Sequence, residues 1–180
     1  MMTLLLGGAR SGKSRYALEL ARLLSPCPLF VATSRSWDAE HRARIERHQR
    51  ERGPEWRSVE CELDLASLEL DGEVAVIDCV TLWLSNFFSD ENADVERCLG
   101  RARPMIDRLA ARRAELLVVS NELGQSLHAP TELGRKFVDL QGLVNQYIAA
   151  RADNVAWMVA GIAHYVKGQA PLQDQAPRVG

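Results

Sequence analysis

Eight residues near the start of the chain restrict its possible folds more than any other segment. Residues 7–14 read Gly-Gly-Ala-Arg-Ser-Gly-Lys-Ser and match every fixed position of the pattern Gly-x-x-x-x-Gly-Lys-[Ser/Thr]. The apolar residues 3–6 before them predict a buried strand, and residues 13–24 have helical periodicity. A strand, a glycine-rich turn and a helix in this order form a phosphate-binding loop. A glycine-rich turn with a chance lysine is the alternative, and it leaves this context unexplained.

Each residue type in the loop has a task in phosphate binding. The glycines let backbone N–H groups turn toward phosphate oxygens, and the helix N-terminus adds its dipole. Lys13 would neutralise the β- and γ-phosphates, and the Ser14 hydroxyl would ligate Mg²⁺. We therefore expect a purine nucleoside triphosphate, GTP or ATP, to bind Gly7, Gly8, Ala9, Arg10, Ser11, Gly12, Lys13 and Ser14.

An acidic residue supplies the second half of the expected site. Residues 74–78 read Val-Ala-Val-Ile-Asp, a buried strand with Asp78 at its carboxyl end. Ligands of open α/β sheets bind at that end of the strands, and a strand-end Asp holds Mg²⁺ in proteins with this loop. An Asp that only caps the next turn is the alternative, and the upstream loop favours the metal.

The rest of the chain alternates apolar strands with helical segments. Further strands are predicted at 29–33, 56–60, 116–119 and 155–160, and further helices at 38–52, 93–113 and 133–151. On the first helix, Tyr16, Leu20, Leu23 and Leu24 are expected to face the core. This order predicts an α/β fold, a mostly parallel sheet with helices on both faces. With 180 residues and no internal repeat, we expect a single catalytic domain over 1–180.

Composition argues against several classes of partner. A formal net charge of -2 gives no field that would favour nucleic acid or an anionic membrane. No apolar run approaches the length of a membrane span, and the apolar start is too short for a signal peptide. The cysteines have neither metal-site nor redox-motif spacing, so we expect reduced thiols packed in the core of a cytoplasmic protein. They are Cys27, Cys61, Cys79 and Cys98.

A charged segment contains a histidine with a possible chemical role. If residues 38–52 are helical, Arg44, His48 and Arg52 fall on one face. Two guanidiniums would disfavour protonation of the imidazole, and a neutral imidazole can act as a nucleophile. From spacing alone, however, a solvated charged face is the better interpretation. We assign no role to His41, His128 or His164.

Several segments together resemble a known family, the bifunctional adenosylcobinamide kinase / adenosylcobinamide-phosphate guanylyltransferases of cobalamin biosynthesis. The similarity spans nearly the whole chain, and this combination is far more specific than the loop alone. The main segments are the loop at 7–14, Val-Ala-Thr-Ser at 31–34, Arg-Ile-x-x-His at 44–48 with Trp-Arg-Ser-Val-Glu at 56–60, and Asp-Cys-Val-Thr-Leu-Trp-Leu-Ser-Asn at 78–86. Ser120-Asn121-Glu122, Asn145-Gln146 and Lys167-Gly168 also match.

The resemblance implies a RecA-like P-loop NTPase fold, a homotrimer and two activities on a corrinoid substrate. A nucleoside triphosphate first phosphorylates the aminopropanol hydroxyl of adenosylcobinamide. His48 then attacks the α-phosphate of GTP, releases pyrophosphate and holds GMP, which the phosphate of adenosylcobinamide phosphate takes up to give adenosylcobinamide-GDP. The resemblance thus reverses the interpretation of His48 from spacing, and makes His48, Lys13 and Asp78 the catalytic residues.

The resemblance also implies which residues contact the guanine nucleotide. The carboxylate of Glu60 is a candidate acceptor for guanine or ribose donors. The implied contacts are Ala32, Thr33, Ser34, Gln49, Arg50, Glu51, Arg52, Glu60 and Leu82.

One region departs from the family pattern. The segment 123–130 is one residue longer than usual before its proline, Ser126 replaces a glycine, and Val138 replaces an arginine. These changes predict altered corrinoid handling with an intact nucleotide site. A divergent subgroup with compensating contacts from Arg135 or Lys136 is the equal alternative.

Two other functions stay open on sequence grounds. One is a P-loop kinase for another small hydroxyl substrate, and the other is a nucleotide-dependent ATPase or GTPase switch. Neither would form a covalent GMP adduct, so detection of that adduct separates them from the family activity.

Overall fold

A seven-stranded sheet with strand order β3-β2-β4-β5-β1-β6-β7 organises the chain. The computed structural model describes residues 1–35, 53–125 and 128–171. The strands are β1 (Met2–Gly7), β2 (Leu29–Ala32), β3 (Arg57–Glu60), β4 (Val74–Asp78), β5 (Glu115–Asn121), β6 (Asn154–Val159) and β7 (Ile162–Lys167). The helices are α1 (Lys13–Leu24), α3 (Val80–Asp90), α4 (Val95–Ala110) and α5 (Glu132–Arg151), with a 3-10 turn η1 (Leu65–Ser67).

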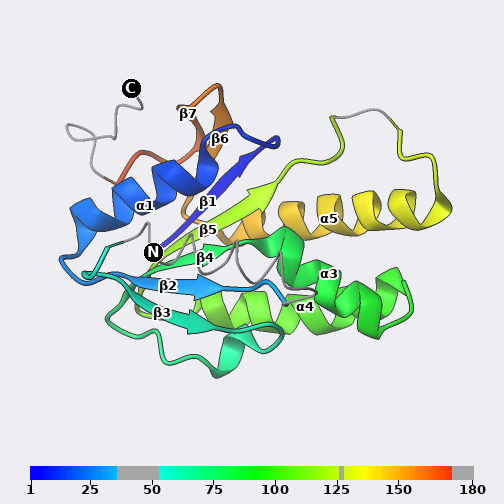
Figure 1. Ribbon diagram of the computed structural model, residues 1–180, viewed down its shortest axis with the longest axis horizontal. Helices are drawn as coiled ribbons and strands as arrows, with labels where there is room; N and C mark the ends of the chain where they lie inside the picture. Colours follow the sequence, from blue (N-terminus) through cyan, green and yellow to red (C-terminus); the bar gives the residue numbers. More distant parts are fainter. Residues whose placement is uncertain (36–52, 126–127, 172–180) are drawn as a thin grey trace.

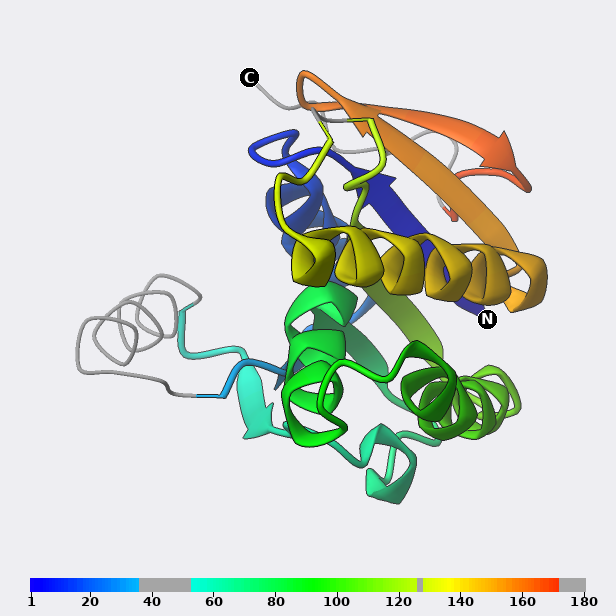
Figure 2. The same ribbon diagram turned by 90° about the vertical axis from the view of Figure 1, so that its right-hand side faces the viewer.

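The sheet is parallel from β3 to β6, and β7 pairs antiparallel with β6 as a hairpin. The arrowheads of β1 to β5 point toward the right in Figure 1, so Figure 2 looks onto the carboxyl edge of the strands. Parallel strands align their carboxyl ends, and that edge is where an open α/β sheet binds ligands.

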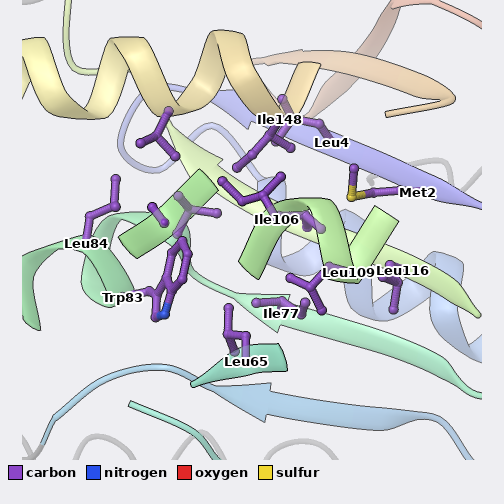
Figure 3. Close-up of a cluster of buried hydrophobic side chains, with 14 of the residues drawn as sticks. Met2, Leu4, Leu65, Ile77, Trp83, Leu84, Ile106, Leu109, Leu116 and Ile148 are labelled. Carbon is purple, nitrogen blue, oxygen red and sulfur yellow. The ribbon is translucent and has the colours of Figure 1, made fainter. Parts of the chain in front are cut away.

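Helices cover both faces of the sheet, as predicted. On one face, Tyr16, Ala17 and Leu20 of α1 pack against strand residues such as Leu5 and Val76. On the other face, α3, α4 and α5 bury a larger apolar cluster, part of which Figure 3 shows around Trp83. Its labelled members include Leu4, Ile77, Leu84, Ile106, Leu116 and Ile148. Burial of strands from both sides explains their continuous apolar sequences.

Side chains define where α4 and α5 begin. The Asp94 carboxylate accepts a hydrogen bond from the Arg97 amide, and the Thr131 hydroxyl accepts one from the Gly134 amide. Such caps satisfy backbone N–H groups that have no partner within the helix. At α1 the N-cap residue is Gly12, which has no side chain to do this. The first turn of α1 therefore keeps its amides for another acceptor.

The mostly parallel α/β fold is confirmed, but besides the short turn η1 one helix and one strand were not predicted. One is α3, although its buried residues Val80, Trp83, Leu84, Phe87 and Phe88 follow the helical spacing i, i+3, i+4, i+7, i+8. The other is β7, whose turn from β6 consists of Ala160 and Gly161 instead of a strong Asn-Gly signal. His164 consequently lies within a strand and not after the last one.

Some local predictions were wrong. Leu23 is 46% exposed because the buried face of α1 runs through Tyr16, Ala17, Leu20 and Ala21 instead. Cys79 and Cys98 are buried as expected, but Cys61 is only half-buried and Cys27 is exposed in the turn after α1. The predicted helix at 38–52 lies outside the described residues. Within the described part of the chain, no helix is long and apolar enough to cross a membrane.

Candidate active site

The carboxyl ends of five neighbouring strands bring several of the predicted residues to one edge. In the strand register, Gly7 of β1 is level with Asn121 of β5, and Ala32 of β2 is level with Asp78 of β4. Ala32 is also level with Glu60 of β3. The phosphate loop, the strand-end acid and two of the proposed guanine contacts, Ala32 and Glu60, therefore share one rim, which faces the viewer in Figure 2.

The loop between β1 and α1 has the backbone conformation of a phosphate cradle. Arg10 and Gly12 have positive φ angles of 56° and 93°, and this left-handed conformation occurs in turns whose successive amides form an anion-binding concavity. The Tyr16 amide donates to the Gly12 carbonyl at 2.9 Å and so starts the helix directly after the loop. Amides in such a turn, together with the helix dipole, make an anion site.

The turn between β6 and β7 braces this loop from outside the motif. The Gly161 amide donates to the Ser11 carbonyl at 2.9 Å. A Cβ on Gly12 would lie 3.0 Å from the Gly161 Cα, and one on Gly7 would lie 2.5 Å from the Met158 carbonyl oxygen. Gly7 and Gly12 are therefore required by contact with β6 and its turn as well as by phosphate. The motif itself gives no signal of this contact.

Lys13 is a buried cation next to the phosphate loop. Its side chain is buried, and the ammonium donates to the Gly8 carbonyl at 2.6 Å and to the Ser11 hydroxyl at 3.4 Å, both neutral oxygens. Burial lowers the pKa of Lys13, while the charges of Asp78 and Cys79 oppose the shift. A buried charge is costly unless it is paired. Nucleotide phosphates would add negative charge to that of Asp78 beside this buried ammonium.

The residues predicted to hold Mg²⁺ fit that ion. Ser14 lies exposed in the first turn of α1, and the half-buried Asp78 ends β4 and interacts electrostatically with Lys13. A hydroxyl and a carboxylate are the hard oxygen ligands that Mg²⁺ takes together with phosphates and water. Ser14 and Asp78 are therefore the residues that would hold the ion beside the β- and γ-phosphates.

Buried polar groups connect the segments that directly follow β2 and β3. The Thr33 hydroxyl donates to the Cys79 carbonyl at 2.7 Å, so this side chain stabilises the frame of the site. Asn86 of α3 donates to the Thr33 carbonyl at 2.9 Å and to the Glu62 carbonyl at 2.8 Å. These hydrogen bonds fix the distance between the segment after β2 and the segment after β3.

The resemblance implies nucleotide contacts at the carboxyl ends of β2 and β3 and in α3. Among these residues, Ala32 and Thr33 are buried. Ser34 and Leu82 are half-buried, and Glu60 is exposed. The side chains of Ser34 and Glu60 are thus the more accessible to a ligand, and the sequence could not separate them from Thr33.

Arg35 fixes the end of the segment that follows β2. Its guanidinium pairs with Glu62 at 2.9 Å and with both carboxylate oxygens of Asp90 at 2.9 and 3.2 Å. These hydrogen bonds raise the pKa of Arg35 and lower that of Asp90. A bidentate pair of this kind adds directional specificity. The sequence analysis did not single out Arg35.

A polar network holds the carboxyl end of β5. The Asn121 amide group donates to the Thr81 hydroxyl at 3.0 Å, and the Asn145 amide group donates to the Asn121 carbonyl at 3.0 Å. Ser120, Gln141 and Asn145 are buried and hydrogen-bond one another. The sequence identified Ser120, Asn121 and Asn145 only as family matches, and in the structure their hydrogen bonds hold this strand end beside β1, which leads into the phosphate loop.

Arg135 of α5 contacts the loop that departs from the family pattern. The Arg135 guanidinium donates to the carbonyls of Ala129 and Pro130 at 3.2 and 3.3 Å. Lys136 pairs instead with Glu132 of its own helix at 2.7 Å. Of the two proposed compensating residues, only Arg135 contacts the loop in the described residues. Val138 is half-buried in α5, and Ser126 lies outside the described residues.

The predicted guanylyl acceptor lies outside the described residues, together with its neighbours. These are Arg44, His48, Gln49, Arg50, Glu51 and Arg52. Their roles stay predictions from the sequence.

Strand order defines the class of protein. The strand before the phosphate loop, β1, and the strand that ends in Asp78, β4, are separated by β5. An extra strand between the two, in a mostly parallel sheet covered on both faces, is the arrangement of RecA-like P-loop enzymes that bind nucleoside triphosphates.

Comparison with known proteins gives the particular family. Residues 3–166 match the family model described as cobinamide kinase / cobinamide phosphate guanyltransferase. The bifunctional adenosylcobalamin biosynthesis protein CobP of Pseudomonas aeruginosa is 36% identical over 173 residues, which cover 94% of this chain and 99% of the relative. CobU of Escherichia coli is 36% identical over 183 residues, with 93% and 100% coverage. The chain belongs to this kinase and guanyltransferase family.

A solved structure is more distantly similar. The P4 protein from bacteriophage phi6 in complex with ADP aligns with a TM-score of 0.38 at 14% identity, over 90% of this chain and 52% of its own.

Proposed function

We propose that this chain phosphorylates adenosylcobinamide and then transfers GMP from GTP to adenosylcobinamide phosphate, giving adenosylcobinamide-GDP. Family membership over residues 3–166 supports both activities. The observation that carries the proposal is the buried Lys13 in an intact phosphate cradle, with Asp78 on the same sheet edge. Nucleotide binding follows from this site, and the corrinoid acceptor follows from the family.

In the kinase step, the loop amides and Lys13 hold the β- and γ-phosphates, and Lys13 neutralises charge that grows as the phosphoryl group moves. Mg²⁺ bound by Ser14 and Asp78 would supply charge neutralisation between the β- and γ-phosphates. The fold itself holds the helix N-terminus and Lys13 at this edge, and groups fixed in this way need little reorganisation at the moment of transfer.

In the guanylyl step, His48 is the proposed nucleophile. The α-phosphate of GTP transfers to the imidazole, and the bond to pyrophosphate breaks. The phosphate of the corrinoid then displaces the histidine and takes the GMP. Support comes from the Arg-Ile-x-x-His sequence at 44–48 and from the family. Gln49, Arg50, Glu51 and Arg52 would line the nucleotide together with the accessible side chains of Ser34 and Glu60.

The corrinoid half of the site is where this chain departs from its family. One possibility is a weaker acceptor site, since Ser126 and Val138 replace a glycine and an arginine. The other is compensation, which the contacts from Arg135 to Ala129 and Pro130 favour. Separate measurement of GTP affinity, adduct formation and acceptor KM decides between them. Weak GTP binding with a normal acceptor KM would contradict both.

The direct test of the overall function is a coupled assay with adenosylcobinamide, GTP or ATP, and Mg²⁺. We expect adenosylcobinamide phosphate first and adenosylcobinamide-GDP after GTP is added, each identified by chromatography and mass. Nucleotide hydrolysis without either corrinoid product would favour the switch or ATPase alternative. Phosphorylation of other small alcohols only would favour the other kinase.

The proposal includes three coarser features of the working enzyme. Residues 1–180 act as one catalytic domain, since the described strands share a single sheet. Free cysteines at 27, 61, 79 and 98 suit the reducing cytoplasm. A homotrimer follows from the family resemblance, and its direct test is mass measurement in solution.

A further inference from the structure

The residue directly after β5 lies in a place where a kinase needs a proton acceptor. β5 lies between β1, which leads into the phosphate loop, and β4, which ends in Asp78. The next residue is Glu122, and its amide donates to the Gly7 carbonyl at 3.0 Å. The backbone of Glu122 is thus hydrogen-bonded to the first residue of the phosphate cradle.

The strand end that carries Glu122 is held from several directions. Thr81 accepts a hydrogen bond from the Asn121 amide group at 3.0 Å, and Asn145 donates to the Asn121 carbonyl at 3.0 Å. Asn145 is in turn buried against Ser120 and Gln141. A catalytic side chain must be held close to its productive geometry by the hydrogen bonds and packing of the residues around it. The hydrogen bonds around Asn121 give the neighbouring Glu122 such support.

The Glu122 carboxylate is oriented but keeps free acceptor capacity. Its side chain is half-buried, and Oε1 accepts a hydrogen bond from the Gly124 amide at 2.8 Å. A Cβ at Gly124 would lie 3.1 Å from that oxygen, so the glycine leaves room for this geometry. A carboxylate has about four acceptor sites. Further lone pairs of Glu122 therefore remain for a substrate hydroxyl.

Other acids on this edge are engaged differently. Asp78 belongs to the Lys13 and Mg²⁺ region, and Glu62 pairs with Arg35. Glu60 ends β3, which is separated from β5 by β2 and β4. Among the described carboxylates, Glu122 is thus the one that combines closeness to the phosphate loop with an orientation fixed by a backbone amide.

We infer that Glu122 is a further catalytic residue, which accepts the hydroxyl proton of the alcohol substrate in the kinase step. This inference rests on the proposed function. The hydroxyl oxygen forms a bond to the γ-phosphorus, and the bond from that phosphorus to the β–γ bridging oxygen breaks, which releases the nucleoside diphosphate. The proton moves from the hydroxyl to Glu122 and then to water. The GMP transfer to His48 involves no such hydroxyl and does not need Glu122.

The test is the variant Glu122→Gln, which keeps an oxygen for the Gly124 amide but cannot take the proton. General base catalysis contributes about 10²–10⁴-fold, so we expect kinase kcat to fall by about 10²-fold or more. The KM for nucleotide, the Kd for GTP and the temperature of unfolding should stay close to wild type. Glu122→Asp, which keeps a displaced carboxylate, should retain more kinase activity than Glu122→Gln.

Glu69→Gln is the matched control, because Glu69 is exposed in the connection between η1 and β4. It should keep full kinase activity. A wild-type chain without kinase activity on adenosylcobinamide would contradict the proposed function itself. An active wild type with Glu122→Gln within about threefold of it would overturn the inference alone. Parallel loss of GTP affinity and kinase activity in both Glu122 variants would also overturn it, since it would show a structural role.

Discussion

The substitution Gly12→Ala tests how the phosphate loop is built. Gly12 is the N-cap of α1, has a φ of 93°, and lies against the β6–β7 turn at Gly161. Two costs therefore arise from one methyl group. One is a left-handed backbone at a residue with a Cβ, and the other is contact between the new Cβ and the Gly161 Cα at 3.0 Å.

These costs define the expected size of the effect. A left-handed conformation costs about 1–2 kcal/mol for a residue with a Cβ. The reduced freedom of the unfolded chain returns about 0.4–1 kcal/mol, while crowding against the Gly161 backbone adds about 1–3 kcal/mol. We expect a net loss of about 1–4.5 kcal/mol, which lowers Tm by about 2–18 °C in a chain of this size.

The assay is thermal unfolding without nucleotide, with Gly8→Ala as the matched control. Gly8 is in the same loop, has no left-handed φ, and has nothing within 4 Å of a Cβ built on it. Its substitution should change the free energy of unfolding by less than about 0.5 kcal/mol. Equal Tm values for the two variants would refute the argument that the β6–β7 turn and the φ of Gly12 make that position glycine-specific.

Three further substitutions test separate parts of the site and core. Lys13→Ala should reduce both kinase and guanylyl transfer by about 10²-fold or more in steady-state assays, and Lys136→Ala, which removes an exposed lysine, should leave both unchanged. Arg135→Ala loses the hydrogen bonds to residues 129 and 130, so acceptor KM should rise about 3–30-fold with GTP affinity unchanged; weaker GTP binding would contradict this. Leu84→Ala, at a fully buried position, should cost about 2–5 kcal/mol in urea unfolding, and a loss below 1 kcal/mol would contradict the packing in Figure 3.

The parts of the fold that the sequence predicted were those with strong local patterns. The strands at 74–78 and 116–119 are apolar runs between polar segments, and helix α1 begins and ends where its periodicity and the Ser-Pro break indicate. Helix α3 was missed although its buried residues have helical spacing. Thr81, Leu82 and Ser85 are half-buried beside them, so the contrast between a buried and an exposed face is weak. Strand β7 was missed because its Ala-Gly turn is a weak hairpin signal.

The candidate site divides in a similar way. Residues for which a local motif predicts a role, such as Lys13 and Asp78, were expected on this edge from the sequence alone, and they lie there. Residues that act through contacts between distant segments were not, because nothing local marks them. Gly161 braces the loop from about 150 positions away, and Asn86, Arg35 and Glu122 acquire partners only when the strands align. Thr33 was expected to contact the nucleotide, and its hydroxyl donates a hydrogen bond to the Cys79 carbonyl.

The central claim, GMP transfer through a histidine, is tested most directly with GTP labelled at the α-phosphate. The chain is incubated with labelled GTP and Mg²⁺, denatured, and examined for protein-bound label. We predict label that is lost in acid and retained in base, as a phosphoramidate requires, and no label in His48→Ala with its kinase activity intact. Absence of label from a wild-type chain that binds GTP, or label that persists in His48→Ala, would contradict the account.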